Sequence, residues 1–93
     1  MTTDEMVKDM TSHVNKGSFS VYGSYERQDD EHGWFEVDYN ELEIMDDGEV
    51  IVYYDCVFTD HEHHFTEREH ERDYFENLPM DEQIDLYEIV MES

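Results

Sequence analysis

The chain has 93 residues, and its 27 acidic residues face only five lysines and arginines. This length fits one domain, residues 1–93, and 14% aromatic residues are too many for a disordered acidic tail. The formal net charge of −22 exceeds the roughly 2–8 units that keep a small domain in solution. Such a charge repels nucleic acid and anionic membranes, so it argues against both as direct partners and predicts a basic protein partner.

Adaptation to high salt is another explanation of the charge, because ions screen the repulsion between carboxylates. The chain has no alanine and is rich in Met, Tyr and His, whereas we expect a salt-adapted domain to favour small residues. The composition therefore favours a functional explanation.

The cysteine content and the apolar runs indicate the compartment. Cys56 is the single cysteine, so it has no partner for an internal disulfide, and it lies in an apolar run typical of a buried thiol. Every apolar run is too short for a signal-peptide core or a membrane span. We therefore expect a cytoplasmic protein.

The first element is an amphipathic helix over residues 3–16. Thr2 and Glu5 have the spacing of a capping box, and Gly17 is a helix stop signal. The apolar residues between them fall one helical turn apart, at Met6, Met10 and Val14.

Three strands follow, because apolar and polar residues alternate in three segments. The first covers 18–27, the second lies after the polar turn Gln28–Gly33 and ends at Ile44, and the third covers 50–59. Asp46-Asp47-Gly48 is a hairpin signal. The alternation breaks at Asn40–Glu41, and the apolar residues share one face only if one extra residue bulges there, so we predict a β-bulge. The expected pairs are Ile44 with Val50, Leu42 with Val52, Tyr39 with Tyr54, Val37 with Cys56, Phe35 with Phe58, Tyr25 with Phe35, and Val21 with Tyr39.

Two helices complete the predicted fold. Thr66 and Glu69 repeat the capping-box spacing and predict a short polar helix over 67–77. Pro79 fits the first turn of a last helix, whose apolar stripe comprises Met80, Ile84, Tyr87 and Met91. The predicted fold class is α+β, with a three-stranded antiparallel sheet, helices on one face and the order α-β-β-β-α-α.

The same register places acidic residues on the other sheet face. Asp38 falls opposite Asp55, where like charges are destabilising, and of the cations in the three strands only Arg27, at one end, could neutralise them. An uncompensated array indicates a binding surface, and an ordinary polar surface is the alternative interpretation. The predicted partner-binding residues on this face, in the two turns and on the polar helix are Asp29, Asp30, Glu31, Glu36, Asp38, Asp46, Asp47, Glu49, Asp55, Glu67, Glu71 and Asp73.

Discrete carboxylates on a folded scaffold can imitate phosphates. Duplex DNA carries about one charge per 1.7 Å of axis, and carboxylates at alternate strand positions lie about 6.7 Å apart. In architecture and charge, over the whole chain but without a shared residue motif, the protein resembles the small acidic DNA mimics that phages use against restriction and CRISPR defences. The resemblance implies a non-enzymatic inhibitor, acting in the host cytoplasm, that blocks the nucleic-acid site of a host defence protein.

Other functions remain open at this point. An immunity or antitoxin-like inhibitor of a basic nuclease toxin explains the charge equally well, because such a nuclease also binds phosphates. The chain has no phosphate-binding loop and no nucleophile elbow, so we expect neither catalysis nor a cofactor, and the sequence leaves monomer and homodimer open. A metal-binding module is a third alternative, with candidate imidazole ligands at His61, His63, His64 and His70.

Overall fold

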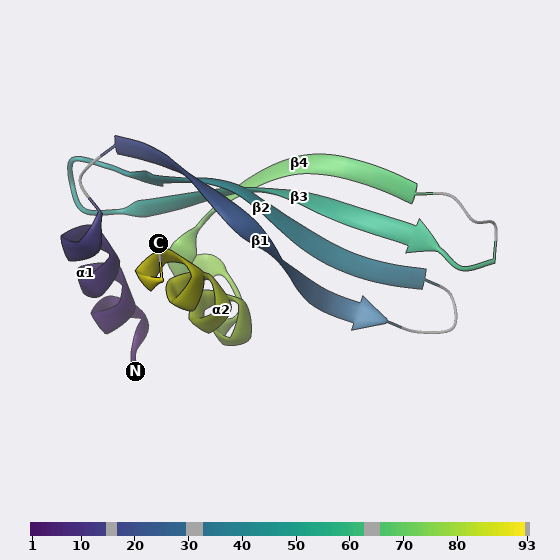
Figure 1. Cartoon of the computed structure of the whole chain (residues 1–93), viewed down its shortest axis with the longest axis horizontal. Coiled ribbons are helices and arrows are strands. Elements are labelled where there is room, and N and C mark those ends of the chain that lie inside the picture. The colour runs from purple at the N-terminus through teal and green to yellow at the C-terminus, as the bar shows by residue number, and fades with distance from the viewer. Residues whose placement is uncertain (15–16, 30–32, 63–65, 93) are drawn as a thin grey trace.

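The computed structural model describes residues 1–14, 17–29, 33–62 and 66–92, without the side chains of residues 19, 28 and 29. Four strands form one antiparallel sheet in the order β1-β2-β3-β4, and both helices lie on the same side of it (Figure 1). Neither described helix is long and apolar enough to cross a membrane. In chain order the elements are α1 (Thr3–His13), β1 (Gly17–Asp29), β2 (Gly33–Ile44), β3 (Val50–Asp60), β4 (Thr66–Tyr74), the 3₁₀ turn η1 (Phe75–Asn77) and α2 (Met80–Met91).

The α+β class is confirmed, but the three-stranded sheet and the element order were wrong. Residues 66–74 form strand β4 in place of the predicted polar helix. Their sequence alternates acidic side chains with other polar ones, which is the period of a strand, while the Thr66–Glu69 spacing imitates a helix start. None of these side chains is buried, so the hydrophobic pattern contained no signal for this strand.

Helix α1 begins as predicted and ends earlier. The side chain of Thr2 accepts a hydrogen bond from the backbone N–H of Glu5 at 3.2 Å, and the Glu5 carboxylate accepts one from the Thr2 backbone N–H at 3.4 Å. The helix ends at His13, short of the predicted residue 16, because Val14 already has extended backbone. Gly17, with a φ of 117°, begins β1 and does not close the helix.

The predicted β2–β3 register is confirmed, including the bulge. Tyr39 pairs with Tyr54 and Glu41 pairs with Tyr53, which leaves Asn40 as the extra residue. This bulge restores the phase of the alternation, so the residues that β2 and β3 contribute to the hydrophobic core lie on the helix side of the sheet.

The predicted β1–β2 register was wrong by two residues. Tyr25 pairs with Val37, and Gly23 pairs with Tyr39. The reason is that β1 continues to Asp29 and contains irregularities after Ser20 and after Glu26, which the sequence pattern did not show. A shift of two residues keeps Tyr25 on its predicted face.

The core fills the space between the helices and one half of the sheet, and the other half extends beyond both helices (Figure 1). Gly23 permits the close approach of α2, since a Cβ at this position would lie 2.5 Å from Cδ1 of Ile89. The buried core residues are Met6, Met10, Val21, Val37, Tyr39, Leu42, Ile44, Val50, Val52, Tyr54, Phe75, Leu78, Leu86 and Val90.

Helix α2 presents a different face to the core than predicted. Two members of the predicted stripe, Met80 and Ile84, are 46% and 41% exposed, whereas Leu86 and Val90 are fully buried. Buried polar residues set this rotation: the Gln83 side-chain amide donates to the backbone carbonyl of Leu78 at 2.8 Å, and Glu82 beside it is also buried.

A partly buried ion pair joins β1 to α2. Glu82 is 1% exposed, and Arg27 donates to its carboxylate through both Nε and Nη2, the latter at 3.0 Å. The guanidinium also lies 5.5 Å from the centre of the Tyr54 ring. The hydrogen bond to Glu82 raises the pKa of Arg27 above its ordinary value. Because the Glu82 carboxylate is removed from water, it requires this arginine as a counter-charge.

We predict that Arg27→Met lowers the free energy of unfolding by about 3 kcal/mol, because it leaves the Glu82 carboxylate buried without a cation. The double variant Arg27→Met/Glu82→Leu should recover most of this loss, since apolar side chains of similar volume replace the pair. Arg72→Met, on exposed β4, is the control and should change little. Urea denaturation measures all three, and a single variant as stable as the wild type would contradict the prediction.

Candidate partner-binding surface

The half of the sheet beyond the helices is open on both faces (Figure 1). We call the face on which the helices pack the inner face and the opposite one the outer face. The molecule measures 45 × 24 × 21 Å, and β4 runs along the open half at one edge of the sheet (Figure 1).

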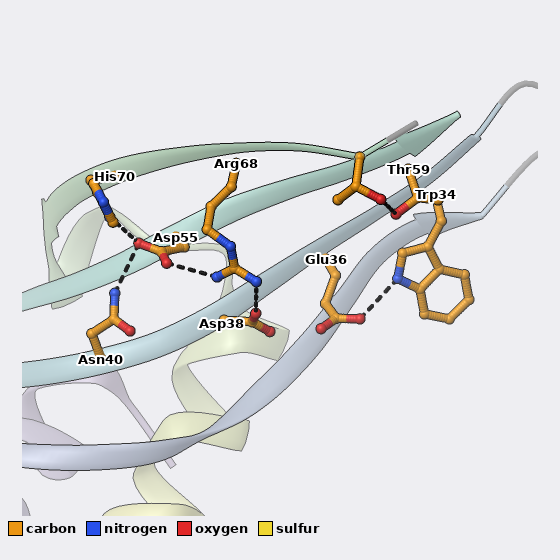
Figure 2. Close-up of polar contacts among 9 residues, drawn as sticks. Trp34, Glu36, Asp38, Asn40, Asp55, Thr59, Arg68 and His70 are labelled. Atoms are coloured by element: carbon orange, nitrogen blue, oxygen red, sulfur yellow. Dashed lines mark hydrogen bonds and ion pairs between the residues drawn. The ribbon is translucent and has the colours of Figure 1, made fainter. Parts of the chain in front are cut away.

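The outer face carries an ion-pair network around Asp55, as Figure 2 shows. Asp55 is 5% exposed. Its carboxylate accepts hydrogen bonds from Arg68 Nη1 at 2.7 Å and from Asn40 Nδ2 at 3.0 Å, and it also bonds to His70 Nδ1. Arg68 Nη2 lies 3.2 Å from Oδ2 of Asp38, so one guanidinium links both opposed carboxylates.

The prediction that the Asp38–Asp55 pair is uncompensated was therefore wrong. The neutralising group, Arg68, and a further hydrogen-bond partner, His70, come from β4, which the sequence pattern had placed on a helix. The hydrogen bond from Arg68 lowers the pKa of Asp55, with smaller contributions from His70 and Asn40. Asp55 is thus an internal carboxylate that holds β4 to the sheet and is not free for a partner.

Glu36, the third acid predicted on this face, is half-buried beside Asp38. Its carboxylate accepts a hydrogen bond from Trp34 Nε1 at 2.9 Å (Figure 2). The contact with Asp38 raises the pKa of Glu36, and the Trp34 bond opposes that shift. Glu36 and Asp38 are therefore partly engaged by neighbours and form a weak candidate surface.

The inner face of β4 carries the acids that are available to a partner. Successive residues of a strand point to opposite faces of the sheet. These acids therefore lie on the inner face, whereas Arg68 and His70 lie on the outer face. They pair with inner-face residues of β3, for example Glu69 with Cys56, and successive carboxylates are about 6.7 Å apart. We call Glu67, Glu69, Glu71 and Asp73 the acidic row. The three glutamates are exposed, and Asp73 is half-buried. The Tyr54 hydroxyl donates a hydrogen bond of 3.5 Å to the Asp73 carboxylate.

A hollow lies between the acidic row and two aromatic residues of the open half, Phe35 and Phe58. Its volume is about 210 Å³, and its lining comprises Phe35, Cys56, Phe58, Glu67 and Glu69. The rings of Phe35 and Phe58 are 4.7 Å apart and tilted by 34°. Burial raises the pKa of the Cys56 thiol, so this thiol forms part of the hollow as a neutral group.

The other predicted acids lie elsewhere. Asp46, Asp47 and Glu49 are exposed in the β2–β3 turn, at the end of the molecule near α1 (Figure 1). Asp47 accepts a hydrogen bond from the Glu49 backbone N–H at 3.0 Å. Asp29 ends β1, and Asp30 and Glu31 lie outside the described residues. The fold therefore divides the predicted set among separate places and does not gather it on one face.

The candidate metal ligands are also separated. His70 bonds to Asp55, and His61 follows the end of β3, whereas His63 and His64 lie outside the described residues. Within the part of the chain that the structure describes, no three His, Cys, Asp or Glu side chains are grouped closely enough to hold a metal ion.

We predict that Asp55→Asn lowers the free energy of unfolding by about 1 kcal/mol at pH 7, because it weakens the bonds to Arg68 and His70. The folded-state pKa of Asp55 lies below its ordinary value of 3.8. Its stabilisation is therefore present above pH 3.8 and is lost as the pH falls through the lowered pKa. Urea denaturation at a series of pH values from 7 down to below 3.8 measures the difference.

Glu36→Gln is the matched control for this experiment, since it removes a carboxylate whose pKa is raised. It should leave stability at pH 7 unchanged or increase it. Equal losses in the two variants would contradict the distinction between Asp55 and Glu36.

The chain matches no protein-family model, no curated protein sequence and no solved structure. The fold and the geometry of its charged surfaces are therefore the basis for a functional proposal.

Proposed function

We propose that this protein is a non-enzymatic DNA mimic that blocks the nucleic-acid-binding site of a host defence protein, such as a CRISPR effector or a restriction enzyme. The observation that carries the proposal is the acidic row, which presents carboxylates at regular spacing along an exposed edge strand. A basic groove that binds a phosphate backbone would meet this row as it meets DNA.

The strand geometry keeps the row available. Arg68 is an arginine of β4 for which the structure describes ion pairs. It lies on the outer face and pairs there with Asp38 and Asp55. Its charge therefore compensates the outer face and leaves the row on the inner face for a partner. Because β4 is hydrogen-bonded to β3 along its length, the carboxylates are held at fixed intervals without help from a partner.

Size and charge fit the same function. The longest dimension of 45 Å covers about thirteen base pairs at 3.4 Å per pair. A net charge of −22 holds counterions, and binding to a basic groove would release counterions from both partners. The affinity should therefore fall steeply with added salt, as it does for DNA itself.

We predict that Glu67→Gln/Glu69→Gln/Glu71→Gln weakens binding to the target by at least tenfold at about 100 mM salt and makes the affinity less dependent on salt. The matched control Asp46→Asn/Asp47→Asn/Glu49→Gln removes the same number of charges from the β2–β3 turn and should have a much smaller effect. Circular dichroism checks that both variants are folded. Equal losses of affinity in the two variants would show that the total charge of the protein determines binding, and this would contradict a specific role of the acidic row.

The target can be found by affinity capture from a bacterial lysate at low salt. We expect the captured protein to be released by added duplex DNA at constant ionic strength, because mimic and DNA compete for one site. Mass spectrometry then identifies it as a defence protein or as a basic nuclease toxin, which would instead make the chain an immunity protein. A partner released by salt but not by duplex DNA would contradict DNA mimicry.

A further inference from the structure

We propose that the hollow beside the acidic row is a socket for one arginine side chain of the basic partner. The inference rests on the proposed function for its basic partner, and it adds a specific contact to the general attraction of charge. It is carried by the combination of aromatic rings and carboxylates around one small hollow.

The lining matches the two parts of an arginine side chain. The Phe35–Phe58 pair offers an apolar and aromatic surface for the methylene stem and for the face of the guanidinium. Glu67 and Glu69, which lie across from Phe58 and Cys56 on β3, supply carboxylate oxygens to its N–H donors. A guanidinium is planar, weakly hydrated and able to stack, whereas the ammonium of lysine is a strongly hydrated point charge. The socket should therefore prefer arginine over lysine.

The volume sets the size of the occupant. About 210 Å³ is below the roughly 300–1,000 Å³ of pockets that hold small-molecule ligands. One long side chain fits this volume, and because the hollow opens on the inner face beside the acidic row, a partner held by the row can insert that side chain.

The protein already binds one of its own arginines by the same chemistry. On the same face, Arg27 pairs with Glu82 and lies 5.5 Å from the Tyr54 ring centre, and its Nη1 lies 3.8 Å from Sγ of Cys56. Cys56 thus lies between this internal arginine and the hollow. Because Glu82 neutralises Arg27, that arginine presents little net repulsion to a second one.

Two synthetic peptides of equal charge test the socket: a heptalysine, and the same peptide with arginine at its central position. We expect the arginine peptide to bind the wild-type protein about two- to fivefold more tightly, which corresponds to a cation–π contact at an exposed site. Phe35→Leu should abolish this preference without weakening the heptalysine complex, since it keeps apolar volume and removes the ring. Phe35 is 41% exposed, so the variant should fold.

Cys56 provides a second readout, because it is the only cysteine and lines the hollow. The arginine peptide should slow alkylation of Cys56 by iodoacetamide more than heptalysine does at equal saturation.

Equal affinities of the two peptides for the wild type, or an arginine preference that survives in Phe35→Leu, would overturn the socket. If the triple variant of the acidic row also loses heptalysine binding in that case, the proposed function stands without the socket. Failure of both peptides to bind at low salt would remove the basis for both proposals.

Discussion

The structure depends on how a very small number of cations is distributed among many carboxylates. Among the residues that the structure describes, two arginines bind the two buried acidic residues, Arg27 at Glu82 and Arg68 at Asp55, and these acids are 1% and 5% exposed. A charge removed from water requires a partner, whereas an exposed carboxylate is stabilised by water and ions. Two of the few positive charges therefore lie beside the buried carboxylates, and the exposed acids depend on water and ions instead.

The same distribution gives β4 two different faces. Its outer face holds the strand to the sheet through Arg68 and His70, and this replaces the apolar anchors that the strand lacks. Its inner face carries the acidic row. The outer network stabilises the position of the row without reducing its charge, because alternate side chains of a strand point to opposite sides. Structural contacts and the proposed binding contacts are thus separated residue by residue along one strand.

The sequence was informative where apolar alternation specified a face and silent where polar contacts decided the structure. The bulge at Asn40 followed from the pleat alone, because only one register placed the large apolar residues together. Strand β4 has no buried side chain, so apolar periodicity does not distinguish it from a polar helix, and its pairing with β3 and the contacts of Asp55 decide the structure. The rotation of α2 was missed because Gln83 and Glu82 are buried by specific polar partners, and a hydrophobic stripe cannot reveal those. For the candidate surface, Glu67, Glu71 and Asp73 were in the predicted set and Glu69 was not, and the face that these four acids share became clear only with the strand.

The position of β4 at the edge of the sheet has a consequence for self-association. An open edge is a template on which a second molecule can add its own strand, and this is a common route to aggregates. If two β4 edges paired antiparallel about a two-fold axis perpendicular to the sheet, residues of one face would meet residues of the same face. Glu69 would then oppose another carboxylate of the row, and the repulsion would recur along the strand. In that arrangement the row would oppose growth of the sheet through the β4 edge, whereas a positively charged partner would meet no such repulsion.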